Sequence, residues 1–240
     1  MEIATESLTL TTADGRIPCH LAQPAAGGQY PAVIVVMEAF GLNGHIRAVA
    51  ERIAREGYVT LAPDLYARFG SPVVSYDEIP KAIEYMKKLD DAKVMAEVGA
   101  RIEHLEGWPE VRAARIGITG FCMGGAVAFK SAAHHTVDLK AVVAFYGGAS
   151  LAGDSALLAR IKAPVLALWG EKDELIPLDQ VQRVEQTMRR LGKTYESKVY
   201  AGAGHGFFCD ERGSAKLAKP NRRPPWTPGP ADRWFSKYLK

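Results

Sequence analysis

The feature that constrains the fold most is an alternation of short apolar runs with longer amphipathic stretches along most of the chain. A continuous apolar run is typical of a strand buried on both faces, and apolar residues at helical spacing indicate a helix that packs on a sheet. Strands that alternate with helices predict a mostly parallel central sheet with helices on both faces. We therefore expect an α/β fold in three layers. The expected parallel strands are residues 31–37, 58–63, 115–119, 139–145, 164–169 and 195–200.

The remaining segments complete this expected architecture. Two β-rich segments, residues 7–12 and 17–23, flank the turn-forming pair Asp14-Gly15 and predict an N-terminal hairpin. We expect an irregular excursion over residues 69–80, followed by a long helical region. The apolar face of that region consists of Val94, Val98, Ile102 and Leu105. The other expected helices are residues 45–56, 126–133, 178–191 and 232–239.

Length and composition fit one globular domain. The chain has 240 residues, of which 48% are hydrophobic and 24% are charged, as in ordinary soluble proteins. We expect a single domain over residues 1–240, in which residues 219–240 form a proline-rich basic strap and a final helix. The first residues are acidic and polar, unlike a secretion signal, and no apolar stretch approaches the length that spans a membrane. The expected location is the cytoplasm, with no membrane partner.

Cysteine count and charge narrow the classes of function. Three scattered cysteines are too few for a disulfide framework or a zinc knuckle, and an odd number leaves at least one free thiol, which suits a reducing compartment. The net charge is +3, but residues 212–240 hold eight Lys or Arg and one acidic residue. Because this basic segment has no repeated aromatic or RNA-binding signature, we interpret it as a solvated tail and expect no nucleic-acid partner.

Residues 119–125, TGFCMGG, place a cysteine between two glycines at the end of an expected strand. The pattern G-x-nucleophile-x-G forms a strained strand-to-helix turn, the nucleophile elbow, that lifts the nucleophile clear of the sheet. Glycine fits at Gly120 and Gly124 because larger side chains there would collide with the neighbouring chain. The N-terminus of the following helix favours a thiolate at Cys122. The alternative interpretation is a small buried cysteine in a glycine-rich turn.

A thiolate nucleophile needs a proton acceptor, and the acceptor needs a group that orients it. Asp173 lies in the loop EKDELIP and His205 in the loop GAGHGFF, each directly after an expected strand. Functional groups of open parallel sheets gather at these carboxyl ends of strands. We predict that His205 is the general base and acid and that Asp173 fixes its tautomer. The residues that compete for these two roles are Glu171, Glu174, His45, His134 and His135.

A third segment, MEAFGLNGHIR at residues 37–47, follows the first buried strand. Glu38 is expensive to bury as an ion, so it belongs either in a loop or helix cap or beside a functional group. The oxyanion hole of such an elbow takes one backbone N–H from this loop and one from the residue after the nucleophile. The expected donors are therefore Ala39 and Met123, with Glu38 beside the thiol of Cys122.

Five motifs in order resemble those of the dienelactone hydrolases, also called carboxymethylenebutenolidases. They are E-x-F-G-x-N at residues 38–43, APDLYAR at 62–68, G-F-C-M-G-G at 120–125, the Asp173 loop and GAGHGF at 202–207. The match spans about residues 8–210, and five ordered motifs are more specific than any one alone.

The resemblance implies an α/β-hydrolase fold that carries a Cys-His-Asp triad, formed here by Cys122, His205 and Asp173. It also implies that Glu38 controls the protonation of the thiol and that the enzyme needs no metal or other cofactor. The implied activity is hydrolysis of small activated esters or lactones through an acyl-thioester intermediate.

The expected substrate pocket departs from the family pattern at its charged positions. Family members that act on dienelactone hold its carboxylate with arginines, one after the LYAR motif and one shortly after the catalytic histidine. This chain has no arginine over residues 69–100, and Phe208 and Cys209 stand after the histidine. Either Arg68 and Arg212 take over this role, or the substrate lacks the carboxylate. The other candidate substrate-binding residues are Phe40, Tyr66 and Phe207.

The nucleophile itself limits the reaction. A thiolate attacks activated acyl groups readily at neutral pH, and His205 can then activate the water that hydrolyses the acyl-thioester. Enol lactones and aryl esters therefore suit this site better than amides. Two other hypotheses stand beside it: attack of the same thiol on phosphotriesters or thioesters, and a non-enzymatic binding protein that docks through its basic tail. We expect a monomer or a small homo-oligomer.

Overall fold

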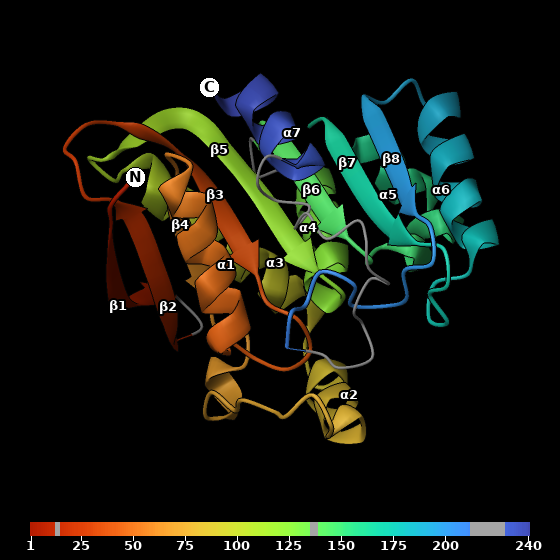
Figure 1. Ribbon diagram of the computed structural model, residues 1–240, viewed down its shortest axis with the longest axis horizontal. Helices are drawn as coiled ribbons and strands as arrows, with labels where there is room; N and C mark the ends of the chain where they lie inside the picture. Colours follow the sequence, from red (N-terminus) through yellow and green to blue (C-terminus); the bar gives the residue numbers. More distant parts are fainter. Residues whose placement is uncertain (13–14, 135–138, 212–228) are drawn as a thin grey trace.

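The computed structural model describes residues 1–12, 15–134, 139–211 and 229–240. In this part of the chain, eight strands form one sheet in the order β1-β2-β4-β3-β5-β6-β7-β8 (Figure 1). The strands are β1 (Ile3–Thr12), β2 (Gly15–Pro24), β3 (Tyr30–Val36), β4 (Val59–Pro63), β5 (Val111–Phe121), β6 (Ala141–Phe145), β7 (Val165–Gly170) and β8 (Tyr195–Tyr200).

Helices cover both faces of this sheet, as the alternation in the sequence predicts. In Figure 1, α1 and α7 lie in front of the sheet, and α3, α4 and α5 lie behind it. The helices are α1 (Gly44–Arg55), α2 (Ile79–Lys87), α3 (Asp91–Glu106), α4 (Met123–Ala133), α5 (Ser155–Arg160), α6 (Leu178–Arg190) and α7 (Pro230–Leu239), with short 3-10 turns at Ala67–Phe69 and Ala149–Gly153. Within the described ranges, no helix has the length and apolar character needed to cross a membrane.

The strand directions agree with the prediction of a mostly parallel sheet. β1 pairs antiparallel with β2, and β2 pairs antiparallel with β4. All further pairs, from β4 and β3 through to β7 and β8, are parallel. The predicted N-terminal hairpin is therefore confirmed, although Asp14 of its turn lies outside the described residues.

The register of the parallel strands brings three loops to one edge. Gly120 of β5 lies opposite Val36 of β3 on one side and Ala144 of β6 on the other. Because parallel strands end at the same edge, the residues that follow β3, β5 and β6 begin side by side. β7 and β8 continue this alignment, since Gly170 lies opposite Tyr200.

Two parts of the helical layer differ from the sequence prediction. The long helical region is two helices, because Asp90 accepts a hydrogen bond from the backbone N–H of Lys93 (2.9 Å) and so starts α3 as a new helix. The six-residue α5, which follows the cap of Asp154, is too short to give a periodic signal and was not predicted.

The C-terminal helix α7 packs directly on the sheet. Phe235 and Leu239 are fully buried, and a Cβ atom at Gly117 of β5 would lie only 2.7 Å from the ring of Phe235. Glycine at position 117 therefore lets the helix approach the strand closely. This helix confirms the expected helix at residues 232–239, whereas residues 219–228 of the predicted strap lie outside the described residues.

Candidate active site

Cys122 joins a strand to a helix with no intervening residue. β5 ends at Phe121 and α4 begins at Met123, and Cys122 has a φ of 54° and a ψ of −115°. A positive φ at a non-glycine residue is strained, and such strain concentrates at functional sites. A Cβ atom at Gly124 would lie 2.5 Å from the carbonyl oxygens of Val36 and Met37. The turn therefore has the geometry that the glycine pattern indicates.

Asp173 and His205 meet although 31 residues separate them in the chain. Oδ2 of Asp173 lies 2.9 Å from Nδ1 of His205. The other carboxylate oxygen accepts hydrogen bonds from the backbone N–H groups of Leu175 (2.9 Å) and Ile176 (3.0 Å), which fixes the carboxylate in its loop. Its side chain is 1% exposed, so this pair is shielded from solvent.

The two glutamates that compete with Asp173 do not reach the histidine ring by any contact among the described residues. Glu171 accepts a hydrogen bond from the backbone N–H of Gly202 (2.7 Å), which ties the loop after β8 to the loop after β7. Glu174 is exposed to solvent. Asp173 is therefore the one of these three carboxylates that forms a hydrogen bond with His205.

The pKa of His205 is higher than that of an ordinary histidine. Burial of the ring by itself would lower its pKa, but the hydrogen bond with Asp173 and the interaction with Cys122 outweigh burial and raise the pKa to about 9. Nε2 is buried and has no hydrogen-bond partner of good geometry among the described residues. The ring is nevertheless close enough to Cys122 for a negative charge on that sulfur to raise the histidine pKa. Tyr146 packs edge-on against the ring, with centroids 5.2 Å apart.

Glu38 is fully buried at the same sheet edge, directly beyond β3. Its Oε1 accepts a hydrogen bond from the hydroxyl of Tyr146, and its Oε2 accepts one from Tyr76, each over 3.2 Å. Burial and the nearby carboxylate raise the pKa of both phenols far above the ordinary value, so both hydroxyls stay protonated and can donate. Cys209 is also close to the Tyr76 hydroxyl and contributes to that rise.

Asn43 connects this carboxylate to the start of α1. Its Nδ2 donates to the hydroxyl of Tyr76 over 3.0 Å, and its Oδ1 accepts from the backbone N–H of Ile46 over 3.1 Å. The same side chain is therefore both the cap of α1 and a partner of the tyrosine that binds Glu38. The sequence analysis missed Tyr76 and Tyr146, since nothing local marks them as neighbours of Glu38, and it named Asn43 only as the last residue of the motif that begins at Glu38.

The two predicted oxyanion donors flank the elbow. Neither the N–H of Ala39 nor that of Met123 donates a hydrogen bond to another residue in the part of the chain that the structure describes. Both amides therefore remain available as donors. Tyr66 touches both residues: its hydroxyl donates to the carbonyl oxygen of Ala39 (3.0 Å) and contacts Sδ of Met123 (3.9 Å).

Of the candidate substrate-binding residues, Phe40 and Phe207 are buried aromatic side chains, and Arg68 is held in an ion pair. Phe40 is buried against Tyr76, with ring centroids 4.5 Å apart, and Phe207 is buried against Tyr146, with centroids 5.1 Å apart. Arg68 forms an ion pair with the buried side chain of Glu97, so its guanidinium is already engaged. Arg212 lies outside the described residues.

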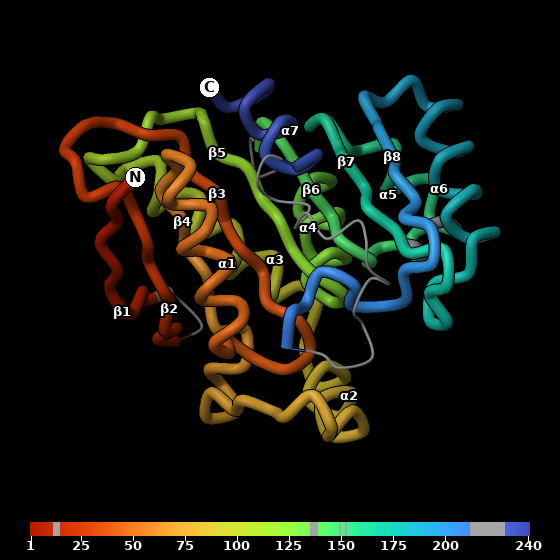
Figure 2. Tube along the Cα trace, in the orientation of Figure 1, coloured from red at the N-terminus to blue at the C-terminus, as the bar shows by residue number. Residues whose placement is uncertain are grey.

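The loop after β8 runs beside the start of α1 (Figure 2), where the rings of His45 and Phe208 have centroids 6.0 Å apart. Burial lowers the pKa of His45 to about 4, with a contribution from the charge of Arg52. His45 is therefore neutral at physiological pH and packs as a core side chain. This packing positions the loop that carries His205.

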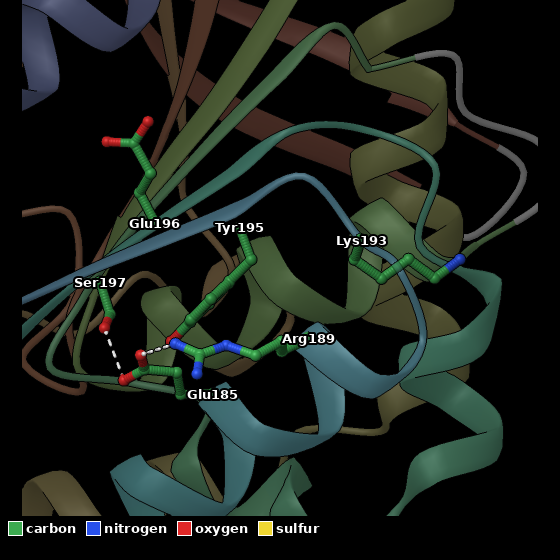
Figure 3. A pocket seen from close by; sticks show the side chains of 6 residues that line it. All are labelled: Glu185, Arg189, Lys193, Tyr195, Glu196 and Ser197. Carbon is green, nitrogen blue, oxygen red and sulfur yellow. Dashed lines mark hydrogen bonds and ion pairs between the residues drawn. The ribbon is translucent and has the colours of Figure 1, made fainter.

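Two surface cavities lie away from Cys122, Asp173 and His205. One, of about 290 Å³, lies at the start of β8, whereas His205 follows the end of that strand. Figure 3 shows its polar lining, in which Glu185 binds both Arg189 and Ser197. The other, of about 470 Å³, lies at the C-terminal end of α4, at the far end of the helix from Cys122. No cluster of three or more potential metal-ligating side chains exists among the residues that the structure places.

Comparisons with known proteins show the family of this chain. The sequence profile of the dienelactone hydrolase family matches residues 17–223. A protein of Methylorubrum extorquens with the provisional name carboxymethylenebutenolidase is 42% identical over 211 residues, which cover 84% of this chain and 71% of that protein. A similarly named protein of Escherichia coli K12 is 37% identical over 216 residues, which cover 84% of this chain and 77% of that one.

Solved structures are similar over the whole chain. A crystal structure from Klebsiella pneumoniae, provisionally described as a dienelactone hydrolase, has a TM-score of 0.87 and 33% identity and covers 99% of this chain and 100% of its own. A dienelactone hydrolase-like promiscuous phosphotriesterase from metagenomic libraries has a TM-score of 0.84 and 26% identity, with full coverage of both chains. The profile match, the identity of these relatives and the shared α/β-hydrolase fold show that this chain belongs to the dienelactone hydrolase family.

Proposed function

We propose that this member of the family hydrolyses small activated esters or lactones, with Cys122 as the nucleophile. The observation that carries the proposal is the buried pair of Asp173 and His205, 2.9 Å apart, at the sheet edge where the strained elbow presents the thiol. A nucleophile, a base and a group that orients the base are the parts of a catalytic triad.

The reaction proceeds in two steps. The thiolate of Cys122 attacks the substrate carbonyl, and the N–H groups of Met123 and Ala39 donate to the resulting oxyanion. The C–O bond then breaks, and the departing alkoxide or enolate takes a proton from the imidazolium of His205, which leaves an acyl-thioester. Water attacks this thioester while His205 accepts a proton from it, and the thiolate leaves with the proton still on His205.

The charge state of His205 suits this sequence. With a pKa raised to about 9, the ring holds a proton at neutral pH, stabilised by Asp173 and by negative charge on Cys122. The proton is therefore in place for the leaving group, and its transfer leaves the neutral ring that the second step needs. The family resemblance implies that Glu38 controls the protonation of the thiol in the resting enzyme.

The surroundings of the thiol favour an uncharged substrate. Phe40, Phe207 and Tyr146 are buried at this edge, and Glu38 adds a carboxylate that repels anions. Arg68 is held by Glu97, and Cys209 is buried four positions after His205. We therefore propose neutral aryl esters and enol lactones, rather than dienelactone with its free carboxylate, as the preferred substrates.

Phosphotriesters are a second candidate class. The similarity to a promiscuous phosphotriesterase at a TM-score of 0.84 supports it. The same thiolate could displace an aryloxide from phosphorus, with the same two amides near the phosphoryl oxygen. Cys19, Cys122 and Cys209 form no disulfide with one another, which suits a reducing compartment, and we propose the cytoplasm.

The test compares p-nitrophenyl acetate, cis- and trans-dienelactone and a p-nitrophenyl phosphotriester as substrates of the wild type and Cys122→Ala. Cys19→Ala is the matched control, since Cys19 is another free thiol, buried on β2. We expect rapid hydrolysis of the aryl ester, slow hydrolysis of dienelactone, loss of both in Cys122→Ala and retention in Cys19→Ala. Mass spectrometry of a quenched reaction should find the acetyl group on Cys122.

The other outcomes are informative. Equal efficiency on dienelactone and the aryl ester would contradict the preference for uncharged substrates and leave the mechanism intact. Activity that survives in Cys122→Ala would contradict the nucleophile. A wild type that hydrolyses none of these compounds would contradict the proposed function and favour a binding protein.

A further inference from the structure

The loop that supplies one oxyanion donor, residues 38–43, is held from outside by the segment that follows β4, residues 64–76. The backbone N–H of Val74 donates to the carbonyl oxygen of Phe40 over 3.0 Å. Gly41 has a φ of 87°, and a Cβ atom there would overlap the carbonyl oxygen of Pro72. This segment therefore packs against the loop too closely for either to move alone.

Tyr66 is the least exposed residue of this segment. It is 0% exposed, and its backbone N–H donates to Oδ1 of Asp64 over 2.9 Å. Its ring packs against Phe69 and Tyr85, with centroids 6.2 and 5.6 Å away. A side chain fixed in this way presents its hydroxyl in one direction.

The hydroxyl of Tyr66 contacts both halves of the oxyanion hole. It donates to the carbonyl oxygen of Ala39 over 3.0 Å and lies 3.9 Å from Sδ of Met123. Burial raises the pKa of this phenol well above its ordinary value, with contributions from the charges of Cys122 and Asp64. The group therefore stays protonated and donates at any pH at which the enzyme would work.

We propose that Tyr66 is a positioning residue that preorganises the oxyanion hole. The proposal rests on the proposed function, since it assumes that the N–H of Ala39 binds an oxyanion. The hydrogen bond from Tyr66 to the carbonyl of Ala39 and the bond from Val74 to the carbonyl of Phe40 fix the two peptide groups directly after the donor. The carbonyl oxygen of Glu38 accepts from the N–H of Gly41 over 3.3 Å, so the Glu38–Ala39 peptide is held as well and keeps its N–H in one direction. The contact with Met123 links this loop to the first residue of α4, which supplies the other donor.

This role differs from substrate binding, the role that the sequence suggested for Tyr66. The side chain has no exposed surface, and its hydroxyl already has a partner in Ala39. Preorganised donors lower the barrier because they need no rearrangement as charge develops in the transition state. Loss of the Tyr66 hydroxyl should therefore slow the chemical steps and leave ground-state binding unchanged.

The experiment compares wild type, Tyr66→Phe and Tyr58→Phe on p-nitrophenyl acetate. Tyr58 is the matched control, because it is also 0% exposed but its hydroxyl pairs with Ser236 on α7 (3.4 Å), away from the elbow. We expect kcat of Tyr66→Phe to fall by about 10-fold or more with little change in KM. We expect the affinity for an aryl trifluoromethyl ketone, which binds as a tetrahedral adduct, to fall by a similar factor.

A second pair of variants distinguishes a structural role of the Tyr66 ring from a positioning role of its hydrogen-bond donor. Two further variants carry 4-aminophenylalanine or 4-fluorophenylalanine at position 66, which fill the same space with and without an N–H donor. Higher kcat in the amino variant than in the fluoro variant would support the proposal even if Tyr66→Phe fails to fold.

Three results would overturn this inference. They are an unchanged kcat in Tyr66→Phe, a rise in KM alone, and equal kcat in the amino and fluoro variants. Each of them leaves the proposed function standing as long as the wild type hydrolyses the ester. A wild type without activity would instead contradict the proposed function itself.

Discussion

Charge at the elbow is divided between two groups that approach from different sides of β5. Glu38 follows β3 on one side and accepts hydrogen bonds from two neutral phenols. His205 follows β8 on the other side and has the buried carboxylate of Asp173 as its partner. A proton on the imidazole is therefore stabilised by a fixed counter-charge.

The raised pKa of His205 predicts how stability changes with pH. The folded-state pKa of about 9 lies above the ordinary value of 6.5, so the protonated ring stabilises the fold fully below pH 6.5. This contribution, on the order of 3 kcal/mol, is lost as pH rises through about 9. We expect the free energy of unfolding of wild type to exceed that of Asp173→Asn most at about pH 6 and least at about pH 10, as measured by urea denaturation.

The control for that comparison is Glu171→Gln, which changes a neighbouring loop carboxylate that binds Gly202 and not His205. The difference in unfolding free energy between wild type and this variant should not follow the same pH profile. A difference between wild type and Asp173→Asn that stays constant or grows with pH would contradict the assignment of the shift to His205.

Some residues of this site could be predicted from the sequence and others could not. Cys122, Asp173 and His205 each lie within five positions of the end of a strand, so local patterns place them at one edge. Tyr76 and Tyr146 lie 38 and 108 positions from Glu38, and only the folded chain brings them together. The pairing of Arg68 with Glu97 also crosses 29 positions, so the sequence could not show that this arginine is engaged.

At the scale of elements, the turn between β5 and α4 is a tightly packed junction. Its glycines allow the helix to start directly under the strands, because neighbouring carbonyl groups occupy the space of any Cβ atom. The geometry of this turn was therefore predictable from the glycines in the sequence. The break between α2 and α3 was not, because Asp90 forms a cap only when its side chain turns toward Lys93.

Gly124→Ala tests that junction. The added methyl group would lie 2.5 Å from the carbonyl oxygens of Val36 and Met37, so we expect destabilisation by about 2 kcal/mol or more and a large loss of kcat, because Met123 moves with the helix start. Chemical denaturation and ester hydrolysis measure the two effects.

Gly107→Ala is the matched control for this change. Gly107 ends α3 with a φ of −88°, and its nearest neighbours would be 3.7 and 3.8 Å from a new Cβ atom. Stability and activity should stay close to those of wild type. A similar loss in both glycine variants would contradict the argument from close packing.

At the scale of the whole molecule, the C-terminal helix α7 packs against parts of the chain that are far from it in the sequence. The helix packs on the middle of the sheet, where Phe235 contacts Gly117 of β5 and Ser236 pairs with Tyr58 near β4. One buried core includes residues from both ends of the chain, from Cys19 to Leu239. Because the core is shared, we expect one unfolding transition rather than separate transitions for the two ends.

Phe235→Ala tests this dependence on α7. Removal of a fully buried ring should cost about 3–5 kcal/mol of unfolding free energy. The transitions followed by tryptophan fluorescence and by far-UV circular dichroism should shift together. Ile83→Ala, on the exposed side of α2 with 38% of the residue exposed, should change stability by less than about 1 kcal/mol. Two separated transitions in either variant would contradict a single cooperative unit.

The two hydrogen bonds of the Asn43 side chain also affect how fast this residue deamidates during storage. Asn43 precedes Gly44, a pair in which the glycine nitrogen can attack the side-chain amide and release ammonia. In the folded chain, both atoms of that amide are hydrogen-bonded and the residue is 7% exposed, so it cannot turn toward the nitrogen. Each unfolding event removes this protection. Shelf life would therefore depend on how often the start of α1 opens, and the deamidated product would present a carboxylate to Tyr76 in place of a donor.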